Sequence, residues 1–319
     1  MRLEQGFSMT IDVVMCSDRK ALLGMAVSGR SALEHASETV NFWIVGQDFT
    51  SEDKKMLRTS WEHAHLGSVS FVDISSAAIE GFRSTAYLKS KMTYARYFIA
   101  DFFPDISRCV YLDVDLLVMR DVAELMHLDL GGNAVAACRD IAVRSGKARP
   151  DIARRLGLKD YGDYFNSGVM LMDLAFWRAN GITKRIVDLS IEKEDSLDSQ
   201  DQDALNITFE GKVHFLDTSW NTSQYEKPDP IEGKIVHLVG PVKPWNARYQ
   251  KKFVEPYYRD VIYDRFFDVV DRTAFRGTRP WNPLRLGEMV EYCDSKIPTL
   301  DMVAGKLRRL SKRGGDRAA

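Results

Sequence analysis

The stretch Cys109-Val-Tyr-Leu-Asp113-Val-Asp115-Leu-Leu-Val118 is an apolar run interrupted by two carboxylates with one residue between them. In an extended segment, side chains at i and i+2 point to the same side, so Asp113 and Asp115 should face one point while Val114 faces the interior. Carboxylate oxygens are ligands of Mg²⁺ and Mn²⁺ in sites that also bind substrate phosphates. The stretch therefore predicts a metal–diphosphate site at a strand end. The alternative is a solvated turn, where aspartate is also common.

Around this stretch, the first half of the chain alternates strand-like and helical segments. Segments rich in β-branched and aromatic residues are expected strands at 11–16, 40–45, 69–73 and 109–112. Helical spacing occupies 21–35, 51–61 and 93–103. This alternation predicts an α/β fold with right-handed βαβ units and a mostly parallel sheet covered by helices on both faces. Ligands of such sheets bind beyond the carboxyl ends of the strands, so Asp18 is expected at the same edge as Asp113 and Asp115.

The second half continues the same pattern. A strand is expected at 135–138, and Asn166-Ser-Gly168 is interpreted as a turn that feeds an apolar strand ending at Asp173. Helices are expected at 174–179 and 182–193, and a third begins in Ser199-Gln-Asp201-Gln202-Asp203. Acidic residues suit the first turn of a helix, which is the structural alternative to a functional role for these aspartates. A short strand at 235–237 ends in a Gly/Pro loop.

Composition limits the class of protein. With 319 residues and 45% hydrophobic content, the chain can bury the core of a large α/β domain. A net charge of −1 argues against a general nucleic-acid binder. The four cysteines are scattered without a Cys-x-x-Cys pair, which fits a reducing compartment. The first residues lack the apolar core of a signal peptide, and no run of about 18 apolar residues occurs, so a cytoplasmic protein is expected.

A composition shift near Arg276 predicts a catalytic domain at 1–275 and a carboxy-terminal extension at 276–319. Within the extension, apolar residues recur at helical spacing, and cations surround the later half of this stripe. The apolar residues are Leu300, Val303, Leu307 and Leu310, and the cations are Lys306, Arg308, Arg309, Lys312 and Arg313. This pattern predicts a basic amphipathic helix on an anionic membrane surface, at the inner face of the cytoplasmic membrane. The alternative is that the stripe packs on the catalytic domain.

A second segment complements the two carboxylates. His237-Leu-Val-Gly240-Pro-Val-Lys243-Pro-Trp245 contains an imidazole, a glycine that lets the backbone approach an anion and a lysine that binds phosphate as a point charge. A histidine beside apolar residues is by itself more often a hydrogen-bonded core residue. Combined with Asp113 and Asp115, the segment provides three metal ligands and positive charge for a leaving diphosphate. No Ser, Cys or Thr nucleophile pattern occurs in the sequence.

Five segments together resemble the family 8 glycosyltransferases, over residues 10–245. They are Tyr94-Ala-Arg96, Tyr111-Leu-Asp113-Val-Asp115, Phe165-Asn166-Ser-Gly168, Asp201-Gln202-Asp203-Ala-Leu-Asn206 and the segment from His237 to Trp245. The resemblance is to the bacterial lipopolysaccharide galactosyl- and glucosyltransferases in particular. It implies a GT-A fold, a UDP-glucose or UDP-galactose donor, a Mn²⁺ or Mg²⁺ cofactor, a saccharide or glycolipid acceptor, and transfer with retention of anomeric configuration.

The resemblance also implies roles for individual residues. The metal ligands would be Asp113, Asp115 and His237, with Asp113 also close to the ribose. Contacts to the diphosphate or sugar would come from Arg96, Gly240 and Lys243, with Asp140 as a further acid on the acceptor or sugar side. The transferred sugar would be held by Asn166, Asp201 and Gln202, with Gln202 opposite the leaving group. A neutral glutamine is a poor nucleophile, which favours a same-face substitution. Double displacement through Asp201 or Asp203 remains open.

One motif departs from the family pattern. Relatives commonly carry Asp-x-Asn-Tyr after the first strand, where this chain has Asp18-Arg19-Lys20-Ala21. Asp18 can still accept a hydrogen bond from the uracil ring, but the aromatic ring that would stack on the base is missing. Two rival functions remain: a haloacid-dehalogenase-type phosphohydrolase, which also has Asp-x-Asp after a strand, and a sugar-nucleotide-binding protein without activity.

Overall fold

The computed structural model describes residues 10–84, 90–146, 149–226, 228–240, 243–245 and 256–278. The carboxy-terminal extension predicted at 276–319, with its apolar stripe and basic residues, lies outside these ranges except for its first three residues. None of the described helices combines the length and apolar composition that crossing a membrane requires.

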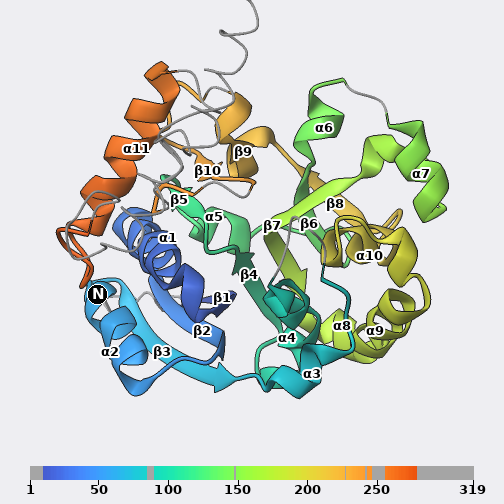
Figure 1. Cartoon of the computed structure of the whole chain (residues 1–319), viewed down its shortest axis with the longest axis horizontal. Helices are drawn as coiled ribbons and strands as arrows, with labels where there is room; N and C mark the ends of the chain where they lie inside the picture. The colour runs from blue at the N-terminus through green and yellow to red at the C-terminus, as the bar shows by residue number, and fades with distance from the viewer. Residues whose placement is uncertain are drawn as a thin grey trace, which may run out of the picture.

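A seven-stranded sheet with the order β3-β2-β1-β4-β7-β6-β8 forms the centre of the molecule (Figure 1). Its strands are β1 (Thr10–Asp18), β2 (Thr39–Gln47), β3 (Leu66–Asp73), β4 (Arg108–Leu112), β6 (Val135–Arg139), β7 (Phe165–Asp173) and β8 (Val213–Leu216). Neighbouring strands are parallel from β3 to β4 and between β6 and β8, whereas β7 is antiparallel to both of its neighbours. The expected mostly parallel α/β sheet is confirmed, with β7 as its reversed strand.

The reversal of β7 positions the site. The chain leaves β6 at Arg139, passes through α6 (Ile141–Arg144), α7 (Pro150–Leu156) and η3 (Tyr161–Asp163), and enters β7 at the same edge of the sheet. Arg139 consequently pairs with Phe165, and the Asp113 N–H donates to Gly168 O at 2.8 Å. The first residues of β7 therefore lie beside the last residues of β4 and β6. A parallel strand would have put them at the opposite edge.

The turn expected at Asn166-Ser-Gly168 is wrong, because these residues belong to β7. Their polarity indicates a turn in sequence, where a polar cluster precedes an apolar run. In the structure, the polar side chains of Asn166 and Ser167 instead form hydrogen bonds to side chains from other elements at the edge of the sheet. Polarity here marks a functional surface of the strand, and the ladder continues through it.

Helices cover both faces of the sheet, as the alternation of elements predicts. Val13 and Met15 of β1 join one apolar cluster with α1 (Leu22–His35) and α2 (Ser51–Ser60). Val14 and Cys16 point to the other face and join a second cluster. The elements on that face are η2 (Lys91–Phe98), α4 (Ile99–Phe102), α8 (Leu174–Ala179), α9 (Ile182–Glu192) and α10 (Asp201–Thr208). This arrangement explains why β1 is apolar at consecutive positions from Val13 to Cys16.

The helix expected at 93–103 differs from the prediction. Residues Lys91–Phe98 form a 3₁₀ helix, and only Ile99–Phe102 are α-helical. Ser90 caps the first of these segments by accepting a hydrogen bond from the Met92 N–H at 3.3 Å. The tighter winding places Arg96, near the end of the 3₁₀ segment, in contact with Asp113 beyond β4.

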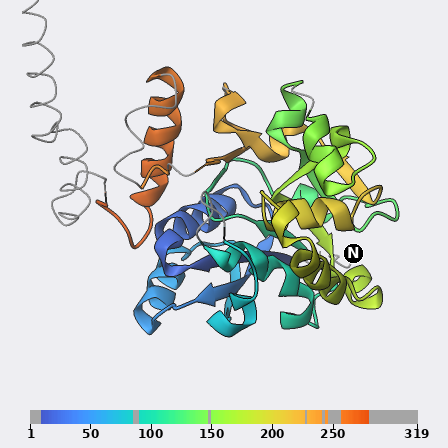
Figure 2. The same ribbon diagram turned by 45° about the vertical axis from the view of Figure 1, so that its right-hand side comes forward.

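A second, three-stranded sheet has the order β5-β10-β9. Its strands are β5 (Leu116–Val118), β10 (Ile235–His237) and β9 (Thr222–Ser223). α11 (Pro256–Val270) runs beside α1, as Figures 1 and 2 show, and completes a third apolar cluster with residues of β5 and β10. The remaining short helices are η1 (Arg19–Ala21), α3 (Ser76–Glu80), α5 (Ala123–Met126), η4 (Glu194–Ser196), η5 (Thr218–Asn221) and η6 (Gln224–Glu226). This second sheet brings His237 next to the loop after β4.

Candidate active site

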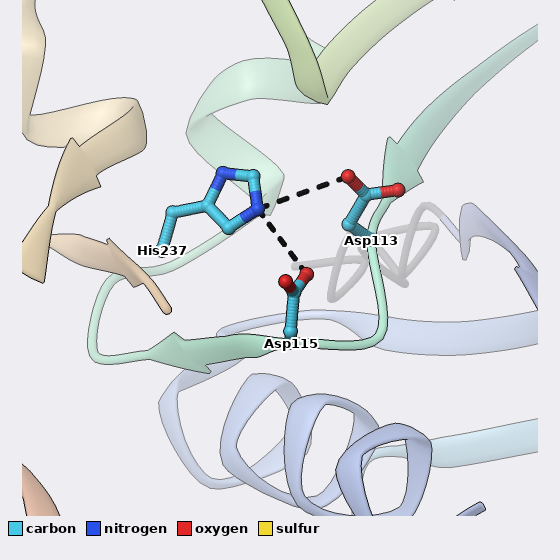
Figure 3. A group of neighbouring side chains, drawn as sticks. All are labelled: Asp113, Asp115 and His237. Carbon is cyan, nitrogen blue, oxygen red and sulfur yellow. Dashed lines mark ion pairs between the residues drawn. The ribbon is translucent and has the colours of Figure 1, made fainter. Parts of the chain in front are cut away.

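Asp113, Asp115 and His237 converge beyond the end of β4 (Figure 3). One ligand atom from each residue lies within 4.8 Å of the others. His237 Nε2 is 3.2 Å from Asp115 Oδ1 and 3.8 Å from Asp113 Oδ2. Val114, between the two aspartates, packs against the apolar cluster beneath α1, as the i, i+2 spacing predicts. The donor set of two carboxylates and one imidazole is the kind that holds a divalent cation.

Gly168 leaves the space that the imidazole ring needs. A Cβ at this position would lie 2.3 Å from His237 Cε1 and 2.7 Å from its Nδ1. Any other residue would therefore displace the ring or the strand. The close neighbour of this glycine is thus a side chain of the site.

Asp115 is balanced by positive charge. Lys243 Nζ forms a close ion pair with Asp115 Oδ2 and donates to Leu238 O at 2.7 Å. Burial acts to raise the pKa of Asp115, but the charges of Lys243 and His237 outweigh it and hold that pKa well below its usual range. The carboxylate is therefore ionised at neutral pH and available to a cation.

Arg96 is buried between two carboxylates. Its Nη2 lies 3.0 Å from Asp113 Oδ1, and its Nε lies 3.1 Å from Asp201 Oδ2. Nη1 donates to Ser167 O at 2.8 Å, and the guanidinium lies over the Tyr111 ring at 4.6 Å. Tyr111 donates its hydroxyl to Asp113 Oδ1 at 2.7 Å. Arg96 thus fixes the orientation of Asp113 from the interior, which a pattern of residue types does not reveal.

A group of amides lies beside the metal ligands. Asp140 Oδ2 accepts from Asn166 Nδ2 at 3.2 Å and from Gln202 Nε2 at 3.3 Å. Gln202 Oε1 accepts from the Ser167 N–H at 3.1 Å. Asn166 Oδ1 accepts two hydrogen bonds, from the Gly168 N–H at 3.0 Å and from Asn221 Nδ2 at 2.8 Å. The structure therefore brings together Asp140, Asn166 and Gln202, as the family resemblance implies.

α10 directs three consecutive residues to three different neighbours, because successive residues of an α-helix are about 100° apart. Asp201 contacts Arg96, and Gln202 contacts the amide group. Asp203 points elsewhere: its side chain is 1% exposed and accepts from the Tyr164 hydroxyl at 2.5 Å and the Ser199 N–H at 3.0 Å. Asp203 is therefore enclosed by the protein, in contrast to the half-buried Gln202.

The two remaining donor-side candidates have clear local roles. Asp18 caps η1 by accepting from the Lys20 N–H at 2.9 Å, and its other oxygen accepts from Ser90 Oγ at 2.8 Å. Gly240 has a φ of +91°, a conformation that favours glycine. Asp18 ends β1, which is parallel to β4, so it lies at the same edge of the large sheet as the end of β4, as expected.

Asn221 at the end of η5 is a residue that the sequence does not single out. It is 2% exposed and joins two of the groups described above, because Nδ2 donates to Asn166 Oδ1 and Oδ1 faces His237 Nδ1 at 3.0 Å. Its sequence context, Ser-Trp-Asn-Thr, has no periodicity or motif that indicates a site. Only its position in space relates it to the other residues.

The model of the family described as glycosyl transferase family 8 matches residues 12–248. General stress protein A of Bacillus subtilis is 27% identical over 277 residues, which cover 80% of this chain and 94% of that protein. The lipopolysaccharide 1,3-galactosyltransferase of Salmonella typhimurium is 29% identical, covering 72% of this chain and 71% of that protein.

Solved structures share the fold. The galactosyltransferase LgtC, crystallised with donor and acceptor sugar analogues, aligns with a TM-score of 0.69 at 23% identity, covering 82% of this chain and 96% of that chain. The glycosyltransferase GlyE of Streptococcus pneumoniae aligns with a TM-score of 0.59 at 23% identity, covering 81% of this chain and 60% of that chain.

Proposed function

The chain belongs to glycosyl transferase family 8, and from that premise we propose that this glycosyltransferase, with its GT-A fold, moves glucose or galactose from a UDP-sugar to a saccharide acceptor. The reaction would depend on a divalent cation and retain the anomeric configuration. Family membership accounts for the Asp-x-Asp stretch, so neither rival function, a phosphohydrolase or a binding protein without activity, is needed to explain it.

The convergence of Asp113, Asp115 and His237 is the observation that carries the proposal. The site fits Mn²⁺ or Mg²⁺, because two carboxylate oxygens and one imidazole nitrogen leave coordination positions for phosphate oxygens. A cation held there would act as a Lewis acid toward the diphosphate and offset the charge that develops on the departing UDP. Lys243, already paired with Asp115, would contribute its ammonium to the same phosphates.

The amide group supports a role for Gln202 at the sugar. The anomeric carbon becomes positive as its bond to UDP breaks, and a preorganised oxygen dipole stabilises that charge. Both acceptor positions of Asn166 Oδ1 are occupied by protein donors, whereas Gln202 Oε1 accepts one hydrogen bond and has a second lone pair. We therefore assign the oxygen dipole to Gln202 and a holding role to Asn166.

The enclosure of Asp203 and the ion pair of Asp201 with Arg96 favour same-face substitution over a covalent intermediate. In this step, the bond from the anomeric carbon to the UDP oxygen breaks and a bond to the acceptor oxygen forms on the same face. The acceptor proton passes to the departing phosphate, so no protein base is required.

The acceptor is proposed to be a saccharide of lipopolysaccharide or another surface glycan, free or linked to lipid. The Salmonella relative named as a lipopolysaccharide 1,3-galactosyltransferase supports this class. Asp18 is proposed to accept from the uracil ring N–H, since its cap and Ser90 contacts leave further lone pairs on the carboxylate.

The direct test is release of UDP from UDP-glucose and UDP-galactose, measured with Mn²⁺, with Mg²⁺ and with excess EDTA. Asp115→Ala should lose most activity while keeping its circular dichroism spectrum, because both cation placement and charge neutralisation depend on this carboxylate. Asp101→Ala, which removes an exposed acid on α4, serves as the matched control and should retain activity. Full activity in EDTA, or in Asp115→Ala, would contradict the metal site.

A further inference from the structure

Asn221 connects the metal ligands to the amide group through a short chain of hydrogen bonds. The chain begins at the Gly168 N–H and Asp140, passes through the side-chain amides of Asn166 and Asn221, and ends at the His237 ring. All of these residues are buried or half-buried, so the protein supplies the partners that water would provide at an exposed site.

The beginning of this chain has a fixed polarity. A main-chain N–H can only donate, so the Asn166 atom 3.0 Å from the Gly168 N–H is the amide oxygen. The other end of the same amide faces Asp140 Oδ2 at 3.2 Å, and a carboxylate oxygen accepts. Both contacts require the same orientation of Asn166, with its oxygen toward Gly168.

The orientation of Asn166 determines which atoms donate and which accept in the remaining hydrogen bonds, as far as His237. Because Asn166 Oδ1 is an acceptor, the Asn221 atom 2.8 Å from it is the amide nitrogen. The oxygen of Asn221 then faces His237 Nδ1 at 3.0 Å, and two acceptors cannot share that contact. His237 Nδ1 therefore carries a proton. A ring that holds only this proton has its lone pair on Nε2, the atom that faces Asp113 and Asp115, whereas a second proton on Nε2, as in the charged ring that pairs with Asp115, has to leave before a cation binds.

Asn221 is itself held in place. Arg144, at the end of α6, donates from Nη2 to Asn221 O at 3.1 Å and forms a close ion pair with Glu226. Glu226 Oε2 also accepts from the Ser223 N–H at 2.7 Å. The segment that carries Asn221 is thereby tied to α6, the helix that Asp140 caps.

We propose that Asn221 is a positioning residue that keeps the ring proton of His237 on Nδ1 and so presents Nε2 to the cation. The inference rests on the proposed cation site and adds to it a residue that contacts no substrate. Without Asn221, the neutral ring would place its proton on Nε2, where Asp115 Oδ1 at 3.2 Å accepts it. A cation would then have to displace that proton before it could bind.

Three variants separate this role from simple packing. Asn221→Leu keeps the volume of the side chain without its hydrogen bonds, and Asn221→Ala removes the side chain. Asn221→Asp keeps an acceptor facing Nδ1 but removes the donor to Asn166 Oδ1, so it is judged by the ring proton alone. Asn133→Ala is the matched control, because Asn133 is half-buried, donates to the main-chain oxygen of Leu130 at 2.7 Å and precedes β6, at the opposite edge of the large sheet.

Two measurements are made on the full chain. Free Mn²⁺ is followed by electron paramagnetic resonance during titration. In metal-free protein labelled with ¹⁵N-histidine, the position of the His237 ring proton is read at alkaline pH, with His237→Gln to assign the signal among the six histidines. We expect Asn221→Leu and Asn221→Ala to bind Mn²⁺ about 10- to 100-fold more weakly and to carry the proton on Nε2. Asn221→Asp should keep the Nδ1 proton, and Asn133→Ala should keep both the affinity and the Nδ1 proton.

The possible results distinguish this inference from the proposed function. If Asn221→Leu retains its Nδ1 proton or binds Mn²⁺ as tightly as the wild-type protein, the positioning role is wrong. Equal weakening in Asn133→Ala would reduce Asn221 to a packing residue. Failure of the wild-type protein to bind Mn²⁺ would instead contradict the cation site, and the proton position would still decide the role of Asn221.

Discussion

At position 168, the missing side chain leaves the space that the His237 ring fills. The main-chain N–H of the same residue orients Asn166, and its carbonyl accepts from the Asp113 N–H. One glycine thus contacts the metal ligands and the amide group at once. Arg96 has a comparable position on the buried side, where it pairs with both Asp113 and Asp201. The geometry of the site thus depends on Gly168 and Arg96, and neither residue has to take part in the chemical step.

Gly168→Ala is expected to weaken Mn²⁺ binding by about tenfold or more, because the new Cβ displaces His237 from the carboxylates. It should also lower the free energy of unfolding by about 1–3 kcal/mol through overpacking. Gly81→Ala is the matched control, since a Cβ there meets nothing within 4 Å and its φ of −67° suits alanine. Calorimetric titration and thermal unfolding measure the two effects. Unchanged Mn²⁺ affinity in Gly168→Ala would show that the His237 ring accommodates the new Cβ and still binds the cation.

Asp201 makes stability depend on pH. Burial, opposed by Arg96 and reinforced by Asp113, raises the pKa of Asp201 to about 6 from an ordinary value near 3.8. The folded state binds this proton more tightly than the unfolded state, so the stabilising contribution is complete below pH 4 and is lost as pH rises to about 6. The loss is on the order of 3 kcal/mol, at about 1.4 kcal/mol for each pKa unit.

Asp201→Asn should therefore flatten the dependence of the free energy of unfolding on pH between 4 and 7. Urea denaturation of both proteins at several pH values measures the difference. A parallel pH dependence in the two proteins would mean that Asp201 titrates in the ordinary range.

At the scale of elements, β7 and α10 bring Asn166 and Gln202 to Asp140. β7 enters the sheet in the reverse direction, which brings Asn166 to the carboxyl ends of β4 and β6. α10 packs beside β7, where Asn206 bonds to both the N–H and the carbonyl of Phe165. That contact sets the rotation of α10, and the rotation decides that Gln202 faces Asp140 while Asp203 faces Tyr164.

Gln202→Ala is expected to lower kcat by about 10²-fold, the scale of losing one preorganised polar contact to the developing charge. The KM for the donor should change less, because under the proposed function the cation and Lys243 would bind the diphosphate. Steady-state kinetics with the preferred UDP-sugar provides both constants. A glycosyl adduct trapped on Gln202 during normal turnover would overturn the assignment and establish a covalent route.

At the scale of the whole molecule, the site lies where two sheets meet. The large sheet contributes Asn166 through β7, and the small sheet contributes His237 through β10. The loop between β4 and β5, which contains Asp113 and Asp115, joins the two sheets. α11 packs against the small sheet and α1, so it supports the His237 side of the site from behind. Folding of both sheets is thus a condition for the cation site.

The carboxy-terminal stripe and its cations, outside the described residues, are proposed to attach the enzyme to an anionic membrane surface, where a lipid-linked acceptor is found. Deleting residues 299–319 should abolish co-sedimentation with anionic vesicles and leave UDP-sugar hydrolysis unchanged. Added salt should weaken vesicle binding by the intact protein, since each Lys or Arg near the surface contributes about 1 kcal/mol through screened charge. Vesicle binding that survives the deletion would assign the tail to packing instead.

Much of the fold follows from local pattern. The strands predicted from the sequence are present, whereas the short strands β5, β8 and β9 and the helices α3, α5, α6, α7 and α11 were not predicted. The first turn of α2 has a capping box between Thr50 and Asp53. The i, i+2 spacing of Asp113 and Asp115 likewise determines a shared direction. These features depend on residues close together in sequence, whose geometry is set by backbone dihedrals and side-chain alternation. Local pattern was therefore sufficient to predict the fold class and the shared direction of Asp113 and Asp115.

Tertiary structure decided what depends on pairing between distant segments. The reversal of β7 follows from the path of the chain after β6, and no local signal at Asn166-Ser-Gly168 distinguishes a polar turn from a polar strand edge. Asn221 meets His237 and Asn166 only because β9 and β10 lie side by side. Asp203 is enclosed because Asn206 sets the rotation of α10. Each of these outcomes depends on hydrogen bonds between residues that are far apart in the sequence. Such bonds form only once the sheets are assembled.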